Sequence, residues 1–202
     1  IYKMNNKIKV GINGLGRIGR HLFKMCIDDP LIEIVGINEL NPDLDNWAYT
    51  LNYDSIYGQS KHKCEIKNKK IICNKESIFT SMCKDITKVK WNDWGAEIII
   101  DASGVLENTL KSRKIIKNKF AKKIIFTNSP KNIDFIMVLG VNENQYDPKK
   151  HDLIGASICD ATAIAPVSKI IDSLYKVRLG YVTTLHPWLS YQNLMDGPSS
   201  SW

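Results

Sequence analysis

The stretch Val10-Gly-Ile-Asn-Gly-Leu-Gly-Arg-Ile-Gly-Arg20 decides the fold class of this 202-residue chain. It overlaps an apolar run, Ile8–Ile12, which predicts a buried strand, and it leads into apolar residues at helical spacing up to Met25. Glycines at 14, 16 and 19 therefore stand between a strand and a helix. A G-x-G-x-x-G in this position is typical of a turn that binds a dinucleotide.

Each glycine of this turn has its own predicted role. Gly14 permits the tight turn, Gly16 lets the backbone approach a pyrophosphate, and Gly19 lets the helix pack closely against the strand. Free amide groups at the start of the helix then hold phosphate oxygens. Chain reversal alone is the competing explanation of the three glycines, and it leaves the nearby acidic residue unexplained.

That acidic residue is Glu39, twenty positions beyond Gly19 at the end of a second apolar strand, Ile32–Ile37. A carboxylate at this place accepts hydrogen bonds from the adenine ribose diol and disfavours a 2′-phosphate. We therefore predict NAD rather than NADP as the cofactor. The alternative is that Asn38 makes this contact while Glu39 faces solvent.

Later apolar runs continue the alternation of strands and helices. Continuous apolar strands separated by helices predict a parallel sheet that is covered on both faces. We expect further strands at Glu97–Asp101, Lys123–Phe126 and Ile136–Val141, with a helix at Thr109–Lys117.

The pattern changes near Ile158, where a helix to about Lys176 and a strand near Leu179–Thr184 are expected. The prediction is thus an α/β fold with two parts. Residues 4–157 form a Rossmann-type doubly wound parallel sheet that binds NAD, and residues 158–202 are the incomplete start of a second, α+β catalytic domain. We expect the chain to be truncated, because such a second domain would otherwise expose apolar edges.

Composition excludes several classes of protein. With 44% hydrophobic and 24% charged residues the chain is globular, and it has neither an apolar run of about 18 residues nor a signal peptide, so no membrane partner is expected. Five cysteines without a C-x-x-C pair favour reduced thiols in the cytoplasm and no metal site. The net charge of +7 favours anionic ligands such as a dinucleotide. Nucleic acid is the competing partner, but no binding motif accompanies the charge.

Beyond the glycine turn the chain resembles the glyceraldehyde-3-phosphate dehydrogenase family, in family order and over nearly its whole length. The matching segments are Tyr53-Asp-Ser55, Ala102-Ser-Gly-Val105, Gly140-Val-Asn142 and Thr183-Thr-Leu-His186. The resemblance implies a cytoplasmic, homotetrameric enzyme of glycolysis that oxidises an aldehyde with NAD. It also implies that the cofactor is surrounded by Asn13, Gly14, Gly16, Arg17, Ile18, Glu39, Ser103, Gly104 and Thr127.

The resemblance further assigns the catalytic pair to Cys159 and His186. A thiol must lose its proton to attack an aldehyde carbonyl, and a helix N-terminus beside an imidazole lowers its pKa. Cys159 would form a thiohemiacetal, from which His186 takes the hydroxyl proton to leave a thioester. Considered alone, Cys159 is equally explained as a small buried apolar residue, and His186 as a structural histidine.

Two segments depart from the family pattern. Ile158 and Asp160 stand where the family has hydroxyl side chains that help to hold inorganic phosphate, and Leu189 and Tyr191 stand where it binds the phosphate of the substrate. A carboxylate at Asp160 repels a phosphate dianion, unless Asp160 only caps the helix. These four substrate-site positions favour a different aldehyde or a different acyl acceptor.

Three hypotheses follow. The first is a phosphorylating triose-phosphate dehydrogenase, and the second is a relative that oxidises another aldehyde and releases the acid by hydrolysis. The third is a non-catalytic module that binds NAD or nucleic acid. Dependence of turnover on inorganic phosphate separates the first two, and the thiol reactivity of Cys159 separates both from the third.

Overall fold

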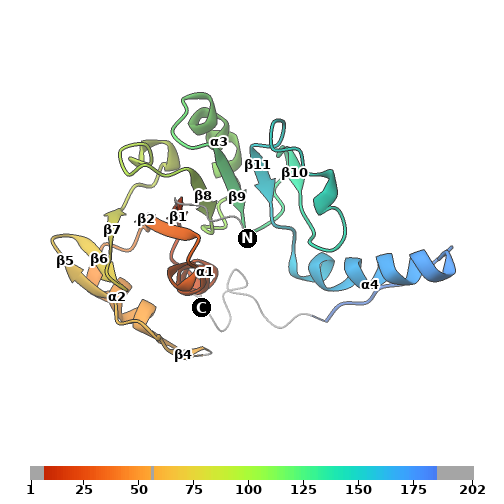
Figure 1. Cartoon of the computed structure of the whole chain (residues 1–202), viewed down its shortest axis with the longest axis horizontal. Coiled ribbons are helices and arrows are strands. Elements are labelled where there is room, and N and C mark those ends of the chain that lie inside the picture. Colours follow the sequence, from red (N-terminus) through yellow and green to blue (C-terminus); the bar gives the residue numbers. More distant parts are fainter. Residues whose placement is uncertain (1–6, 56, 186–202) are drawn as a thin grey trace, which may run out of the picture. The chain divides into compact units, whose positions relative to one another are not determined.

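The structure is a computed structural model that describes residues 7–55 and 57–185 (Figure 1). The described chain forms two compact units, of which the first ends at Ile158 and the second begins at Cys159. The helices are α1 (Arg17–Asp28), α2 (Leu44–Asn52), α3 (Asn108–Lys117) and α4 (Cys159–Tyr175), with short 3-10 helices η1 (Ile86–Lys88) and η2 (Glu143–Gln145). The strands are β1 (Ile8–Asn13), β2 (Ile32–Asn38), β3 (Tyr53–Asp54), β4 (Gly58–Gln59), β5 (Glu65–Lys67), β6 (Lys70–Cys73), β7 (Glu76–Ser81), β8 (Ile98–Asp101), β9 (Lys123–Phe126), β10 (Phe135–Ile136) and β11 (Leu153–Gly155).

The first unit is built on one large sheet. Among the described residues its strand order is β10-β11-β9-β8-β1-β2-β7-β6-β5. The pairs from β10 through to β7 are parallel, whereas β7, β6 and β5 pair antiparallel. The chain leaves β1 toward β2 on one side and later returns to β8 on the other, so the strand order reverses at β1. This topology confirms the predicted Rossmann-type doubly wound sheet.

Two hydrophobic layers cover the sheet, one on each face. On one face Phe23 of α1 and Trp47 of α2 are fully buried against β1 and β2. On the other face Ile115 of α3 packs with Trp91 and with Ile99 of β8. Figure 1 shows α1 and α3 on opposite sides of the strands. The strands are therefore buried on both faces. In such sheets ligands bind at the carboxyl edge, at the point where the strand order reverses.

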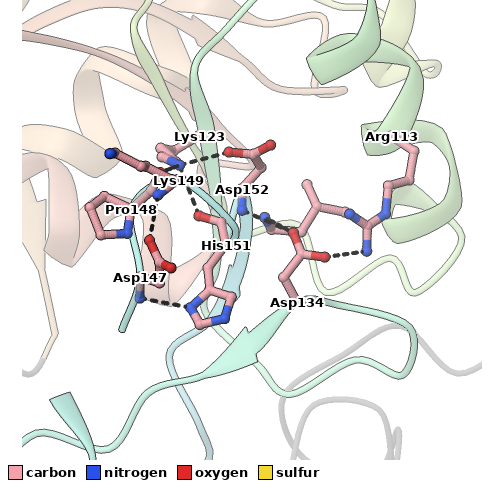
Figure 2. A network of polar contacts seen from close by, with 9 residues as sticks. Arg113, Lys123, Asp134, Asp147, Pro148, Lys149, His151 and Asp152 are labelled. Atoms are coloured by element: carbon pink, nitrogen blue, oxygen red, sulfur yellow. Dashed lines mark hydrogen bonds and ion pairs between the residues drawn. The ribbon is translucent and has the colours of Figure 1, made fainter. Parts of the chain in front are cut away.

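Salt bridges and hydrogen bonds hold the outer parallel strands, as Figure 2 shows. Arg113 of α3 forms a 2.7 Å ion pair with Asp134, whose other carboxylate oxygen accepts hydrogen bonds from the backbone amides of Asp152 and Leu153 at 2.9 and 2.8 Å. Lys123 of β9 forms a 2.6 Å ion pair with Asp152. Burial raises the pKa of Asp134, but the bonds from Arg113 and the two amides lower it below the ordinary aspartate value.

One predicted strand is wrong. Of the expected strand Ile136–Val141 only Ile136 lies in a strand, at the end of β10. The rest is not a strand, because Asn142 folds back on it. The side-chain oxygen of Asn142 accepts from the amide of Val138 at 2.8 Å, and its side-chain nitrogen donates to the carbonyl of Ile136 at 2.9 Å. These bonds satisfy the backbone groups that a sheet neighbour would otherwise pair. The adjacent place in the sheet is taken by β11, which the apolar pattern did not single out.

The second unit, within its described residues, consists of α4 followed by ten residues without regular structure. The helix confirms the one expected from Ile158 to about Lys176, and it continues through Pro166. The strand expected near Leu179–Thr184 is wrong. A strand needs a neighbour to pair with, and residues 159–185 contain no strand.

Candidate functional site

The carboxyl ends of β1, β2 and β8 carry polar side chains that bond to one another. Asn38 donates from its side-chain nitrogen to the side-chain oxygen of Asn13 at 2.8 Å, and Asn13 donates to Asp101 at 3.0 Å. The Ser103 hydroxyl donates to the same Asp101 oxygen at 2.6 Å and accepts from Asn108 at 3.0 Å. Asn13, Asn38, Asp101 and Asn108 are all buried. Since buried polar groups are costly unless paired, this chain of bonds holds the three strand ends in one arrangement.

The glycine turn lies directly on this edge. Gly14 has a φ of +93°, and its amide donates to the carbonyl of Asn38 at 2.7 Å. A side chain on Gly19 would place its Cβ 1.9 Å from the carbonyl oxygen of Gly14. Gly14 is therefore required by its own backbone, and Gly19 by the packing of α1 against the turn.

Gly16 differs from both. Its backbone has a φ of −67°, which any residue adopts, and a Cβ built on it would meet no heavy atom within 4 Å. Neither the conformation nor the packing of the chain thus requires a glycine here. The missing side chain leaves open space at the start of α1, which is what the close approach of a pyrophosphate requires.

The N-terminus of α1 suits an anion. The first amides of a helix have no acceptor inside the helix, and the helix dipole places partial positive charge there. No side chain caps α1, and its first turn contains no acidic residue. The open space at Gly16 and this helix end together fit a dinucleotide phosphate.

Glu39 lies beside the turn and holds it. One of its carboxylate oxygens accepts from the backbone amide of Leu15 at 2.6 Å, and the other accepts from the amides of Leu40 and Asn41 at 2.6 and 3.2 Å. A carboxylate has about four acceptor positions. These three bonds therefore leave one position, on the oxygen that faces Leu15, for a hydroxyl of a ligand.

A cavity of about 200 Å³ opens at this edge. It is smaller than the roughly 300 to 1,000 Å³ of a typical ligand pocket, so it suits one portion of a dinucleotide. Its walls combine turn, strand ends and the loops that follow them: Asn13, Gly14, Gly16, Asn38, Glu39, Leu40, Cys83, Lys84, Ala102, Ser103, Val105 and Asn108.

Five of the expected cofactor residues line this cavity, namely Asn13, Gly14, Gly16, Glu39 and Ser103. The other four are not among its lining residues. Arg17 and Ile18 lie on the exposed first turn of α1, and Gly104 is an exposed residue with a φ of +73°. Thr127 follows β9, where its amide donates to the carbonyl of Asp101 at 3.1 Å.

Sequence reasoning missed the wall that follows β7. Cys83 exchanges two bonds with the Asn38 side chain, donating from its amide at 2.8 Å and accepting at its carbonyl at 2.9 Å, and Lys84 comes next along the wall. No local sequence pattern marks this wall: it follows from the parallel pairing of β7 with β2, because the carboxyl ends of parallel strands meet at one edge. Asn38 was weighed only as an alternative to Glu39, and it takes part in the site through this network.

The expected catalytic and substrate residues fall in different parts of the chain. Ile158, half-exposed, ends the first unit, and Cys159 is the exposed first residue of α4 in the second. The Cys159 sulfur lies 3.9 Å from a carboxylate oxygen of Asp160. His186, Leu189 and Tyr191 lie outside the described residues.

Residues 7–55 and 57–185 contain no group of three or more His, Cys, Asp or Glu side chains that could hold a metal ion. The same residues include no helix long and apolar enough to cross a membrane.

Known proteins are similar to this chain over most of its length. The family model described as "Glyceraldehyde 3-phosphate dehydrogenase, NAD binding domain" matches residues 8–109. Glyceraldehyde-3-phosphate dehydrogenase 1 of Bacillus subtilis is 31% identical over 195 residues, which cover 96% of this chain and 58% of that protein. Glyceraldehyde-3-phosphate dehydrogenase 2 of Trichoderma koningii is 35% identical over 96% of this chain and 56% of its own length. A relative from Leishmania mexicana, named as cytosolic glyceraldehyde-3-phosphate dehydrogenase, is 34% identical over 95% of this chain and 57% of its own length. The chain spans somewhat more than half the length of these curated relatives.

Proposed function

Because this chain belongs to the glyceraldehyde-3-phosphate dehydrogenase family, whose NAD-binding-domain model matches residues 8–109, we propose that the protein oxidises glyceraldehyde 3-phosphate or a related aldehyde through Cys159. The observation that carries the cofactor half of this proposal is Gly16, whose missing side chain serves neither backbone nor packing. Bound NAD supplies the acceptor for the hydride that leaves the substrate.

We assign the pyrophosphate to the open space at Gly16 and the N-terminus of α1. The adenine ribose hydroxyls are assigned to the remaining acceptor position of Glu39. The Asn13–Asp101–Ser103 bonds hold the strand ends beneath the cofactor. Arg17, Ile18, Gly104 and Thr127 complete the proposed cofactor residues on the strength of the family resemblance.

The chemistry is assigned to a thiolate and an imidazole. Cys159 stands at the first position of α4, where the positive end of the helix dipole stabilises a thiolate. The thiolate attacks the aldehyde carbon and forms a thiohemiacetal. His186 takes the proton of its hydroxyl, and oxidation leaves a thioester on Cys159. Phosphate or water then releases the acyl group and restores the thiol.

The test is NADH formation by the full-length protein with glyceraldehyde 3-phosphate and inorganic phosphate, followed by absorbance. Replacing Cys159 with serine should lower kcat by on the order of a thousandfold or more. Cys26→Ala is the matched control, because Cys26 is buried in α1 away from the cavity, and it should keep the activity. Wild-type turnover by Cys159→Ser would refute the proposed nucleophile.

A second candidate function is favoured by Asp160, whose carboxylate lies beside the Cys159 sulfur. Two unit charges 4 Å apart repel by about 4 kcal/mol at an effective dielectric constant near 20. Such repulsion disfavours attack by a phosphate dianion, and Ile158 offers no hydroxyl to compensate. In this reading water cleaves the thioester, and the substrate is another aldehyde that suits Leu189 and Tyr191.

The two functions differ in their dependence on phosphate. Steady-state turnover that falls to near zero without phosphate supports the phosphorylating enzyme and eliminates the hydrolytic one. Undiminished turnover without phosphate supports the hydrolytic enzyme and eliminates the phosphorylating one. In the hydrolytic case Asp160→Ser should create a dependence on phosphate, because it removes the repelling charge and adds a hydroxyl. A panel of aldehydes assayed in both buffers then defines the substrate.

We further propose a catalytic domain that begins in residues 158–202, a homotetrameric assembly and a cytoplasmic location. The start of α4 at Cys159 supports the first assignment, and the name of the cytosolic relative from Leishmania mexicana supports the location. The assembly rests on the family resemblance alone. Light scattering of the full-length protein tests the assembly, with a mass of four chains as the expected result. Cell fractionation tests the location.

A further inference from the structure

Two cysteines outside the cofactor site lie against each other. The sulfur atoms of Cys64 and Cys73 are 2.6 Å apart, and both side chains are buried, with exposed fractions of 2% and 1%. Both are free thiols. Their separation is only about 0.6 Å longer than a disulfide bond. Neither residue lines the cavity at the carboxyl edge.

The hairpin of β5 and β6 dictates this contact. Glu65 pairs with Ile72 in antiparallel register, so Cys64 and Cys73 are the next residues opposite each other. Asn68 and Lys69, the two residues of the turn, both have positive φ, which is typical of a type I′ turn that fixes hairpin register. Opposite residues of an antiparallel pair have Cα atoms about 4.5 to 5.5 Å apart. A disulfide accepts about 4.4 to 6.8 Å, so the backbone need not move far to form one.

A second contact holds the pair in place. The backbone amide of Cys64 donates to the side-chain oxygen of Asn52 at 2.7 Å, and the Asn52 side-chain nitrogen donates back to the Cys64 carbonyl at 2.8 Å. Asn52 is the last residue of α2, so the hairpin is anchored to that helix. The register of the β5–β6 hairpin and the contact with Asn52 of α2 therefore both fix the position of Cys64 opposite Cys73.

The hydrogen bond within the pair favours one thiolate. The hydrogen bond that Cys64 donates to Cys73 lowers the pKa of Cys73 and raises that of Cys64. The ammonium of Lys24 opposes the rise in pKa at Cys64, and the carboxylates of Glu76 and Asp28 oppose the fall in pKa at Cys73, but the hydrogen bond between the two sulfurs is the largest effect on both thiols. Burial opposes ionisation of both thiols. The arrangement therefore makes Cys73 the better nucleophile, with Cys64 in position to react next.

We propose that Cys64 and Cys73 form a reversible disulfide with a peroxide as oxidant. The Cys73 thiolate attacks one peroxide oxygen, so that an S–O bond forms, the O–O bond breaks and hydroxide leaves as water after it takes up a proton. The Cys64 sulfur then attacks the sulfenic acid sulfur, so that the S–S bond forms and the S–O bond breaks. The departing hydroxide takes the Cys64 proton. Two thiols thus lose two electrons and two protons, and one peroxide becomes two waters.

Access to the buried sulfurs depends on the edge of the sheet. Among the described residues β5 is the last strand of the sheet and pairs only with β6 (Figure 1). Edge elements open locally at a lower free-energy cost than central strands. The disulfide would close this edge hairpin covalently, and a thiol reductant would reopen it.

The test is a peptide map of the full-length protein after exposure to hydrogen peroxide, with free thiols alkylated before digestion. Trypsin cuts the segment into Cys64-Glu-Ile-Lys67 and Ile71-Ile-Cys-Asn-Lys75. The expected product is these two peptides joined, and dithiothreitol should separate them. Cys73→Ser should abolish the joined product, and Cys26→Ala, as matched control, should keep it.

A second measurement does not depend on the rate of access. The protein is unfolded, refolded and equilibrated in a buffer of mainly oxidised glutathione, whose disulfide accepts the two electrons and is released as two thiols. The joined peptides should predominate at equilibrium, and the linked wild type should melt several degrees above Cys64→Ser. Alkylation of both residues as free thiols under these conditions would refute the proposal. A separate glutathione on each of the two cysteines, with no bond between them, would also refute the proposal.

Discussion

The side-chain nitrogen of Asn38 donates a 2.8 Å hydrogen bond to the side-chain oxygen of Asn13, which joins the carboxyl ends of β2 and β1 at the point where the sheet reverses its strand order. Asn13 in turn donates a hydrogen bond from its side-chain nitrogen to Asp101 on β8. Asn38 also accepts from the amide of Cys83 in the loop after β7. Two asparagines thus set the positions of four strand ends, and the glycine turn rests on them.

Asn38→Ala tests this network. The substitution leaves the buried Asn13 oxygen and the Cys83 amide without their partner, and an unsatisfied buried group costs about 1–3 kcal/mol. We expect the free energy of unfolding to fall by roughly that amount and the affinity for NAD to fall with it. Urea denaturation and NAD titration measure the two effects. Asn144→Ala, on an exposed residue of η2, is the control and should change neither. Stability equal to wild type in Asn38→Ala would contradict the assigned role.

Gly16→Ala and Gly19→Ala separate a glycine kept for the ligand from one kept for the fold. In Gly19→Ala the new methyl group collides with the Gly14 carbonyl, and such overpacking costs about 1–3 kcal/mol of stability or more. In Gly16→Ala the methyl group meets no protein atom. We expect it to fold nearly as stably as wild type but to bind NAD at least tenfold more weakly.

Thermal melting and NAD titration on both variants give the comparison. Gly16 is the N-cap of α1, where alanine is less favourable than glycine, so a small fall in the Tm of Gly16→Ala, well below that of Gly19→Ala, agrees with the expectation. Unchanged NAD affinity in a well-folded Gly16→Ala would show that no phosphate approaches this position.

Glu39→Gln tests the proposed ribose acceptor. The carboxylate accepts from backbone amides on both of its oxygens, whereas a glutamine has one oxygen and one donor nitrogen. If the glutamine oxygen faces Leu40, its nitrogen faces the Leu15 amide, and two donors meet. We expect NAD affinity to fall by about tenfold, or 1.4 kcal/mol, and the preference for NAD over NADP to shrink because the negative charge is gone. Titration with both dinucleotides measures the two changes, and an undiminished preference would contradict the role of the charge.

The glycine turn and the parallel strands were predictable because their signals are local. Gly14, Gly16 and Gly19 stand between a strand and a helix, and continuous apolar runs mark β2, β8 and β9. The Asn13–Asn38–Asp101 network was not predictable from any one of these segments. It arises from residues 25 and 88 positions apart in the sequence, which only the strand order brings together.

The antiparallel hairpin of β5 and β6 was missed for a different reason. Its strands are three and four residues long, and its turn is Asn68-Lys69 rather than the Asn-Gly that most strongly signals a hairpin. The cysteines opposite each other in this hairpin therefore carried no pattern in the sequence. Only their register pairs them.

Asp134 provides the last prediction, which concerns acid stability. Its carboxylate joins Arg113 of α3 to the backbone amides before and within β11 (Figure 2), and hydrogen bonds to a charged group contribute about 1.5–3 kcal/mol. Because its folded pKa is lowered, the unfolded chain takes up the proton more readily. This contribution is therefore complete above the unfolded pKa of about 3.9 and disappears as the pH falls through the lower folded pKa.

Asp134→Asn should accordingly lower the free energy of unfolding by about 1–3 kcal/mol at pH 7. The difference from wild type should shrink as the pH falls below about 4, because wild type then loses the same charge. Urea denaturation from pH 7 down to pH 3 measures this difference in the free energy of unfolding. Asp93→Asn, on an exposed turn, is the control. A difference that stays constant across this range would mean that the charge of Asp134 does not hold β10 and β11, and that the stability lost in the variant comes from packing alone.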